Sequence, residues 1–187
     1  MNNIKGDKEN TSESAEGKAA ENVAIAIGLR DFFLARNGEE LSAALRSLNW
    51  DMDRARVSRL EYEFNRLFVG PAPPAAPPWA SVYLEKESRL MGEAAVEMRR
   101  LCRALGLAPP DGIPEDWLPI ELELWLVLSI LAEEEGEPAI FEARKKIEIH
   151  ALSWIPFFIE RLKDGAREEE LIFVAERLEE WLETLDE

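Results

Sequence analysis

DWLPIELELWLVLSIL, residues 116–131, is the segment in which helix and strand compete most evenly. Its residues 120–124 alternate between apolar and acidic side chains, which is typical of a half-buried strand. Residues 125–131 are almost all large and apolar, which favours a helix that is buried on every side. No other strand signal in the chain could pair with this segment. We therefore predict a buried central helix with Asp116 as its N-cap and Pro119 in its first turn.

The segments on both sides of this helix carry apolar residues at helical spacing. Ile25, Leu29, Phe32 and Phe33, for example, share one helix face. The predicted helices run from Val23 to a stop at Asn37–Gly38, over 39–48, from an N-cap at Asp51 to a stop at Gly70–Pro71, over 85–105, over 138–162 with a bend or break at Pro156, and from about Arg167, with an apolar stripe through Leu185. The fold class is predicted to be all-α, a single-domain multi-helix bundle.

The chain of 187 residues has the length of one domain. Residues 1–22 lack aromatic side chains and are predicted to be a disordered N-terminal leader to a helical domain over 23–187. The leader has no apolar stretch of the secretory type. The longest apolar run, 122–132, is shorter than the roughly 20 residues that span a bilayer, so no stable membrane insertion is expected.

Charge excludes several classes of partner. Lys and Arg total 22 against 38 Asp and Glu, a net charge of -16. A nucleic-acid binder needs a cationic surface, so we expect no nucleic-acid partner. An anionic membrane would repel the chain for the same reason. One Cys and one His exclude a disulfide framework and a Cys/His zinc site, and they indicate a reducing, cytoplasmic setting.

Half of the excess negative charge lies at the C-terminal end. Residues 164–187 hold ten acidic residues and two arginines, a net charge of -10 + 2 = -8. This run is either a solvated helix face or an electrostatic guide for a cationic peptide. Two triplets, Glu133–Glu135 and Glu168–Glu170, are predicted to be solvated helix ends.

The residues that could carry chemistry are few. His150 lies on a mostly apolar helix face and is predicted to be a structural histidine at a helix junction. Cys102 is predicted to be buried filler rather than a nucleophile. The chain has no Gly-rich phosphate loop and no Glu-x-x-His pair, so neither an enzymatic activity nor a metal site is predicted.

Two loops combine prolines with aromatic side chains, unlike a solvated linker. Residues 70–83 form a stiff polyproline-type segment that ends with Trp79 and Tyr83. Residues 114–117, Pro-Glu-Asp-Trp, place a carboxylate and an indole at the start of the buried helix. Both loops are candidate binding elements.

Together these segments resemble the TorD/DmsD/NarJ family of redox-enzyme maturation chaperones. The stretches that carry the resemblance are EYEFNRLFVGP at 61–71, PPWASVY at 77–83, ED at 115–116 before ELEL at 121–124, and HALSWIP at 150–156. The resemblance covers residues 23–185. Trp117 stands where the family has a histidine, so this position cannot titrate near neutral pH.

The resemblance implies a cytoplasmic chaperone rather than an enzyme. Its partner would be a molybdopterin oxidoreductase catalytic subunit, bound through its twin-arginine signal peptide or in its apo form while the cofactor is inserted and export is held back. The molybdopterin belongs to the client, so no cofactor of its own is implied, and the protein would be a monomer or a helix-exchanged dimer. The implied leader- and client-binding residues are Tyr62, Asn65, Phe68, Pro78, Trp79, Ser81, Tyr83, Glu115, Asp116, Trp117, Glu121, His150 and Trp154.

A groove for such a leader would need aromatic walls for its apolar part and carboxylates for its arginines. Two alternatives remain open. One is a helical adaptor for a different protein partner. The other, less favoured because no phosphate loop is present, is a protein that binds guanine nucleotide weakly.

Overall fold

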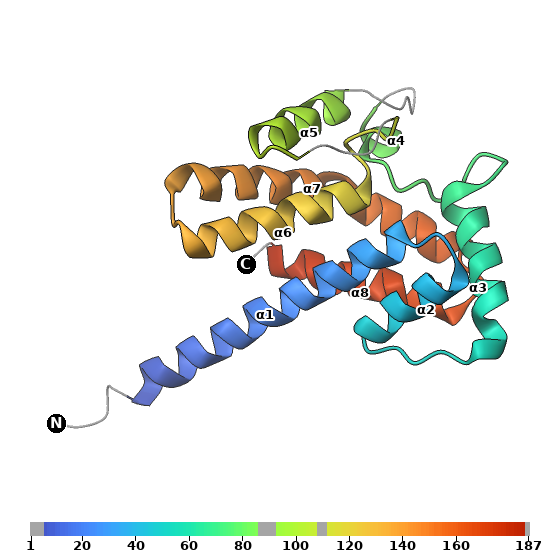
Figure 1. The fold of residues 1–187 in the computed structure, drawn as a ribbon, viewed down its shortest axis with the longest axis horizontal. Coiled ribbons are helices and arrows are strands. Elements are labelled where there is room, and N and C mark those ends of the chain that lie inside the picture. The colour runs from blue at the N-terminus through green and yellow to red at the C-terminus, as the bar shows by residue number, and fades with distance from the viewer. Residues whose placement is uncertain (1–5, 86–92, 108–111, 186–187) are drawn as a thin grey trace.

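The structure, a computed structural model, describes residues 6–85, 93–107 and 112–185 (Figure 1). Helices account for the architecture of the described residues, and the all-α prediction is confirmed. The helices are α1 (Gly6–Leu34), α2 (Gly38–Ser47), α3 (Val57–Phe64), α4 (Ala80–Leu84), α5 (Glu93–Ala104), α6 (Leu118–Glu134), α7 (Pro138–Gly165) and α8 (Glu169–Leu185), with a 3-10 turn at Arg54–Arg56 and a π-helical turn at Asn65–Val69.

Four helices form the body of the molecule. α1 packs on α6, α6 on α7, α7 on α8, and α8 on α1, so the four close into a bundle (Figure 1). α2 and α3 cover one end of the bundle, and α4 packs against α7 and α5. α6 is buried along most of its circumference, including Leu122, Leu124 and Leu128 at 0% exposure. The helical prediction for 116–131 is thus confirmed, because burial on all sides suits this composition.

The N-terminal helix begins earlier than the sequence predicts. α1 starts at Gly6, and in Figure 1 its first part extends away from the bundle. Residues 17–21 are exposed, and from residue 17 onward the first buried side chain is Ile25. Ala, Glu and Lys in this stretch favour a helix even without tertiary packing. Residues 1–5 lie outside the described residues, and a domain boundary at 22/23 stays a prediction.

Several predicted helix limits are wrong. Asn37 does not end α1; it caps α2, and its side chain accepts a hydrogen bond from the Glu40 N–H at 2.9 Å. Within the predicted helix over 85–105, the structure has α5 at Glu93–Ala104, whereas Glu85 is extended and ends the separate helix α4, which was not predicted. Residues 86–92 of that prediction lie outside the described residues. α7 runs through Pro156 as one helix, so of the predicted bend or break the break does not occur.

The Glu168–Glu170 triplet is not a solvated helix end. Glu168 is 5% exposed and Glu170 is 0% exposed. Arg56 contacts all three carboxylates, and Arg59 reaches Glu168 at 2.6 Å. The prediction failed because buried carboxylates need cations, and these cations come from the start of α3, far away in sequence. Glu133–Glu135, in contrast, are exposed as predicted.

Replacing Arg56 should destabilise the fold more than replacing Arg59. Arg56→Gln leaves the buried Glu170 without its paired cation, whereas after Arg59→Gln the carboxylate of Glu168 keeps Arg56. Thermal unfolding followed by circular dichroism should therefore show a larger fall in Tm for Arg56→Gln. Equal shifts for the two variants would contradict this account of the triplet.

Candidate functional site

The site begins at the end of α3, where the helix widens into a π-helical turn. Asn65–Val69 form a π-helical turn, closed by the Gly70 N–H donating to the Asn65 carbonyl at 2.6 Å. Such turns often occur at functional sites because they redirect side chains. Gly70 has a φ of +56°, and a Cβ at this position would collide with the Ala72 carbonyl oxygen. Glycine is therefore required to turn the chain into the proline-rich loop.

The proline-rich loop is fixed to this turn through its backbone. Prolines have no N–H, so the donors come from the alanines between them. The Ala76 N–H donates to the Leu67 carbonyl at 2.8 Å, and the Ala75 N–H donates to the Arg66 carbonyl at 3.4 Å. The loop is thus held against the end of α3. This agrees with the prediction from sequence that it is a stiff segment rather than a flexible linker.

A second backbone pairing joins the two aromatic loops. Trp79 and Trp117 form an isolated antiparallel bridge. The Ala80 N–H donates to the Asp116 carbonyl, and the Leu118 N–H donates to the Pro78 carbonyl, both at 3.0 Å.

The side chain of Asp116 belongs to the same junction. Its Oδ2 accepts a hydrogen bond from the Ser81 N–H at 2.8 Å, so Asp116 caps the first turn of α4. The prediction that it caps α6 is wrong, because Trp117 occupies the N-cap position there with no side-chain cap. Asp116 is 0% exposed. Its burial makes it a positioning residue for the two tryptophans beside it.

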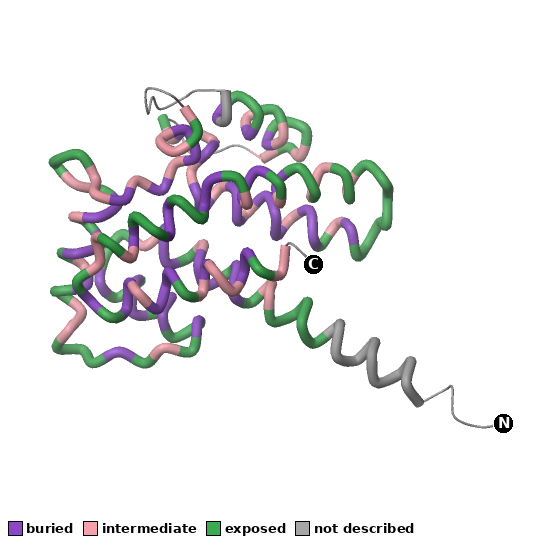
Figure 2. Tube along the Cα trace, turned by 180° about the vertical axis from the view of Figure 1, so that it is seen from behind, coloured by how far each residue is buried: buried purple, intermediate pink, exposed green. Residues whose placement is uncertain are grey.

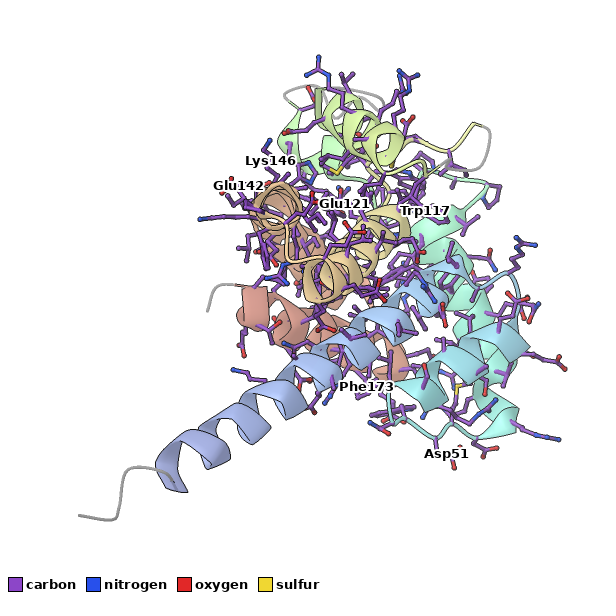
Figure 3. The ribbon with its side chains drawn as sticks, turned by 60° about the vertical axis from the view of Figure 1, so that its left-hand side comes forward. Asp51, Trp117, Glu121, Glu142, Lys146 and Phe173 are labelled. Carbon is purple, nitrogen blue, oxygen red and sulfur yellow. The ribbon has the colours of Figure 1, made fainter. Side chains whose placement is uncertain are left out.

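An apolar groove of about 470 Å³ opens between these elements and the end of α1. The walls come from parts of the chain that are far apart in sequence. Figure 3 shows Trp117 at the start of α6, ahead of Glu121 on the same helix. The lining residues are Phe33, Leu34, Ala35, Arg36, Asn37, Leu41, Glu61, Phe64, Asn65, Phe68, Val69, Pro78, Trp79, Ile113 and Trp117.

Few charges reach this groove. Among the lining residues Glu61 is the one carboxylate, and its Oε2 also accepts a hydrogen bond from the Gly38 N–H at 3.2 Å. Arg36 adds a positive charge nearby. The predicted aromatic walls are therefore present, whereas a cluster of carboxylates for arginines is not found among the lining residues. The geometry suits an apolar segment better than a cationic one.

A buried polar cluster lies between α6 and α7. Glu121 Oε2 lies 3.2 Å from His150 Nδ1 and accepts a hydrogen bond from Trp154 Nε1 at 3.0 Å. Tyr83 stacks on Trp154, with 5.6 Å between ring centroids. These contacts confirm the prediction that His150 is a structural histidine at a helix junction.

Burial and pairing shift both titratable groups of the cluster. Burial raises the pKa of the Glu121 carboxyl, and the hydrogen bond and charge of His150 offset part of that shift. Burial opposes protonation of His150, but the hydrogen bond and charge of Glu121 outweigh it, so the pKa of His150 is raised above its ordinary value. Both pKa values are therefore raised, that of Glu121 by burial and that of His150 by its pairing with Glu121.

The thirteen predicted binding residues fall into three groups. Asn65, Phe68, Pro78, Trp79 and Trp117 line the groove. Ser81, Tyr83, Asp116, Glu121, His150 and Trp154 form or adjoin the buried junction behind it.

The remaining two lie elsewhere. Glu115 pairs with Arg99 of α5 at 2.5 Å, and this pairing lowers the pKa of the Glu115 carboxyl. Tyr62 is 66% exposed and lines a separate depression together with Arg59 and Arg167.

Sequence reasoning missed part of the groove wall. Phe33 was predicted only to lie on an apolar helix face, and Phe64, Val69 and Ile113 were not singled out as site residues. Val69 is 57% exposed although it is apolar, but this exposure depends on the π-helical turn and cannot be inferred from periodicity. The signal that could have identified Val69 and Ile113 was their position within or next to the predicted motifs.

Metal-ligand clusters and membrane-spanning helices are both absent from the described residues. No group of three or more His, Cys, Asp or Glu side chains there is placed to hold a metal ion. Cys102 is buried, as predicted, and burial raises the pKa of its thiol to about 11. None of the described helices combines the length and the apolar composition that crossing a bilayer requires.

His150→Gln should remove a pH-dependent part of the stability. The folded-state pKa of His150 is raised above the value of about 6.5 of an unfolded histidine. Its contribution is therefore complete below that pH and is lost as the pH rises through the folded-state pKa. The Tm difference between the unmodified protein and the variant should shrink on going from about pH 6 to about pH 9. A constant difference would contradict the role given to the Glu121 pair.

Comparisons with known proteins place this arrangement in a family. Chaperone protein TorD of Psychrobacter sp. (strain PRwf-1) is 30% identical over 136 residues, covering 70% of this chain and 62% of that protein. Tat proofreading chaperone DmsD of Salmonella typhi is 30% identical over 109 residues, covering 57% of this chain and 50% of that protein. The chain thus matches only about half to two thirds of the length of these relatives.

A solved structure supports the fold alone. It is a crystal structure of an Archaeoglobus fulgidus protein assigned to redox enzyme maturation, with a TM-score of 0.55 and 17% identity, covering 89% of this chain and 93% of that one. The sequence pattern of the nitrate reductase delta subunit family matches residues 34–160. That range contains the π-helical turn, the proline-rich loop, the Trp79–Trp117 bridge and the Glu121–His150 pair. The chain therefore belongs to the nitrate reductase delta subunit family.

Proposed function

We propose that this protein is a cytoplasmic chaperone for a molybdopterin-containing oxidoreductase subunit. It binds the twin-arginine leader of that subunit, or its apo form, assists insertion of the cofactor and holds back export until the subunit is mature. The relatives are named as chaperones, which supports a chaperone function for this protein. The apolar groove supports binding of the apolar part of a leader. The molybdopterin belongs to the client.

The observation that carries the proposal is the aromatic groove between the two fixed loops. A leader of this type contains an apolar stretch that can fold as a helix and place its apolar side chains in a groove. Trp79 and Trp117 are joined through their backbones, so their indoles are positioned before a ligand arrives. This preorganisation lowers the entropic cost of binding.

The charges of the leader act mainly outside the groove. The chain has a net charge of -16, which attracts a basic peptide from a distance and speeds association. The groove itself holds Glu61 as the one carboxylate among its lining residues. Affinity therefore rests chiefly on apolar burial, and electrostatic attraction supplies rate and selectivity.

The buried residues of the site position the groove rather than catalyse a reaction. Asp116 caps α4, and Glu121 holds His150 and Trp154, the last of which supports Tyr83. The thiol of Cys102 is buried with a raised pKa, so it is a poor nucleophile. These roles support a binding protein, not an enzyme.

Val69→Asp should weaken leader binding, whereas Tyr62→Asp should not. Both side chains are more than half exposed, at 57% and 66%, so neither substitution disturbs the core. Val69 lines the groove and Tyr62 lies outside it, so the new carboxylate would oppose apolar burial only at Val69. Titration of a synthetic twin-arginine leader by calorimetry should show a loss of affinity of about tenfold or more for Val69→Asp alone.

The dependence of leader affinity on salt concentration is a second test of the binding mode. Raising the ionic strength should weaken leader binding modestly, because long-range attraction is screened while apolar burial is not.

If Tyr62→Asp weakens binding as much as Val69→Asp, the groove is not the binding surface.

Asp116→Asn should leave both stability and leader affinity nearly unchanged. An asparagine oxygen can still accept the hydrogen bond from the Ser81 N–H. Asp116→Ala removes the cap of α4 and should lower the free energy of unfolding by about 1 kcal/mol. It should also weaken leader binding, because the loops that carry Trp79 and Trp117 lose the hydrogen bond that joins them through Asp116 and Ser81.

The two Asp116 variants also separate positioning from direct contact. Leader titration and thermal unfolding are measured on both variants. A loss of affinity in folded Asp116→Asn would show that the charge of Asp116 contacts a leader arginine directly.

A further inference from the structure

The outer face of α7 leaves large apolar side chains in solvent. Ile149 is 59% exposed and Phe157 is 57% exposed, and Ser153 and Pro156 between them are also exposed. The inner face of the same helix, with Trp154 among its residues, is fully buried. In Figure 2, where the molecule is seen from behind, exposed and buried segments alternate along this helix.

Charged residues flank the apolar part of this face. Lys146 lies seven residues before Ser153, and Glu160 lies seven residues after it. Both are exposed, and neither forms an ion pair with another of the described residues. At 100° per residue, Lys146, Ile149, Ser153, Phe157 and Glu160 fall within one sector of α7. We call this sector the outer α7 face.

The outer α7 face is complementary to itself. Two copies of α7 that cross antiparallel about a two-fold axis at Ser153 place Ile149 of one copy opposite Phe157 of the other. The same operation places Lys146 opposite Glu160, because each pair is equally spaced around Ser153. Both pairs then occur twice in the interface.

We propose that this protein forms a homodimer through the outer α7 face, with the two α7 helices crossing antiparallel at Ser153. The small serine lets the helices approach closely at the crossing point, and the apolar pairs bury their exposed surface on either side. Glu142 and Asp164, which would face each other as like charges, lie farther out, where crossed helices diverge. One helix crossing buries less than a standard interface, so the dimer depends on protein concentration.

Charge reversal tests the register of the dimer. Lys146→Glu places two acids opposite each other, and Glu160→Lys places two bases opposite each other. Each variant alone should dimerise at least about tenfold more weakly than the unmodified chain in sedimentation equilibrium. An equimolar mixture of the two variants should dimerise again, because both cross-pairs become attractive. Glu176→Lys, an exposed reversal on α8, is the matched control and should leave dimerisation unchanged.

Cross-linking tests the axis. Ser153→Cys should give a disulfide-linked dimer under mild oxidation, because the native Cys102 is buried and the two new thiols meet at the axis. Glu176→Cys at the same concentration should give far less. A protein that stays monomeric at all concentrations would overturn the proposal. So would a mixture of the charge variants that fails to associate, or equal cross-linking at 153 and 176. Leader binding by the same variants checks that each is folded.

Discussion

The requirement to cover α6 on every side organises the molecule. An apolar helix with no solvent face cannot be stabilised by one neighbour, so α1 and α7 pack along it and α8 closes the bundle behind them. The same burial places Glu121 out of reach of water, and His150 and Trp154 of α7 supply polar partners for its Oε2. The start of α6 is in turn held to the proline-rich loop by the Trp79–Trp117 bridge. Fold and candidate site therefore depend on one helix.

Periodicity predicted the elements whose partners are generic. Any apolar neighbour satisfies Leu29 or Leu178, so the buried stripes of α1 and α8 could be inferred from spacing alone. The positions of groups that need one particular partner could not be inferred in this way. Glu170 is buried because Arg56 reaches it, and these two residues are 114 positions apart. Asp116 precedes α6 in sequence and looks like its cap, yet its Oδ2 accepts a hydrogen bond from the Ser81 N–H, which the Trp79–Trp117 bridge brings close to it.

The candidate site shows the same division between pattern and geometry. The motif residues identified the two loops, and five of the predicted residues do line one groove. The opposite wall, with Phe33 and Val69, required knowledge of where α1 ends and of a π-helical turn that has no sequence signature. Trp117 extends the apolar wall with a side chain that does not titrate near neutral pH. Ligand capture in the groove itself should therefore follow shape and apolar area more than protonation.

The walls of the groove also set a condition on when it can exist. Phe33 and Phe64 are made early during translation, whereas Ile113 and Trp117 emerge about fifty residues or more later. A nascent chain with only its first half outside the ribosome lacks Ile113 and Trp117, and it has no partner for the Pro78 carbonyl or the Ala80 N–H. Contacts of such sequence separation form late because the loop between them must close first. Formation of the groove is thus tied to synthesis of the segment that contains Ile113 and Trp117.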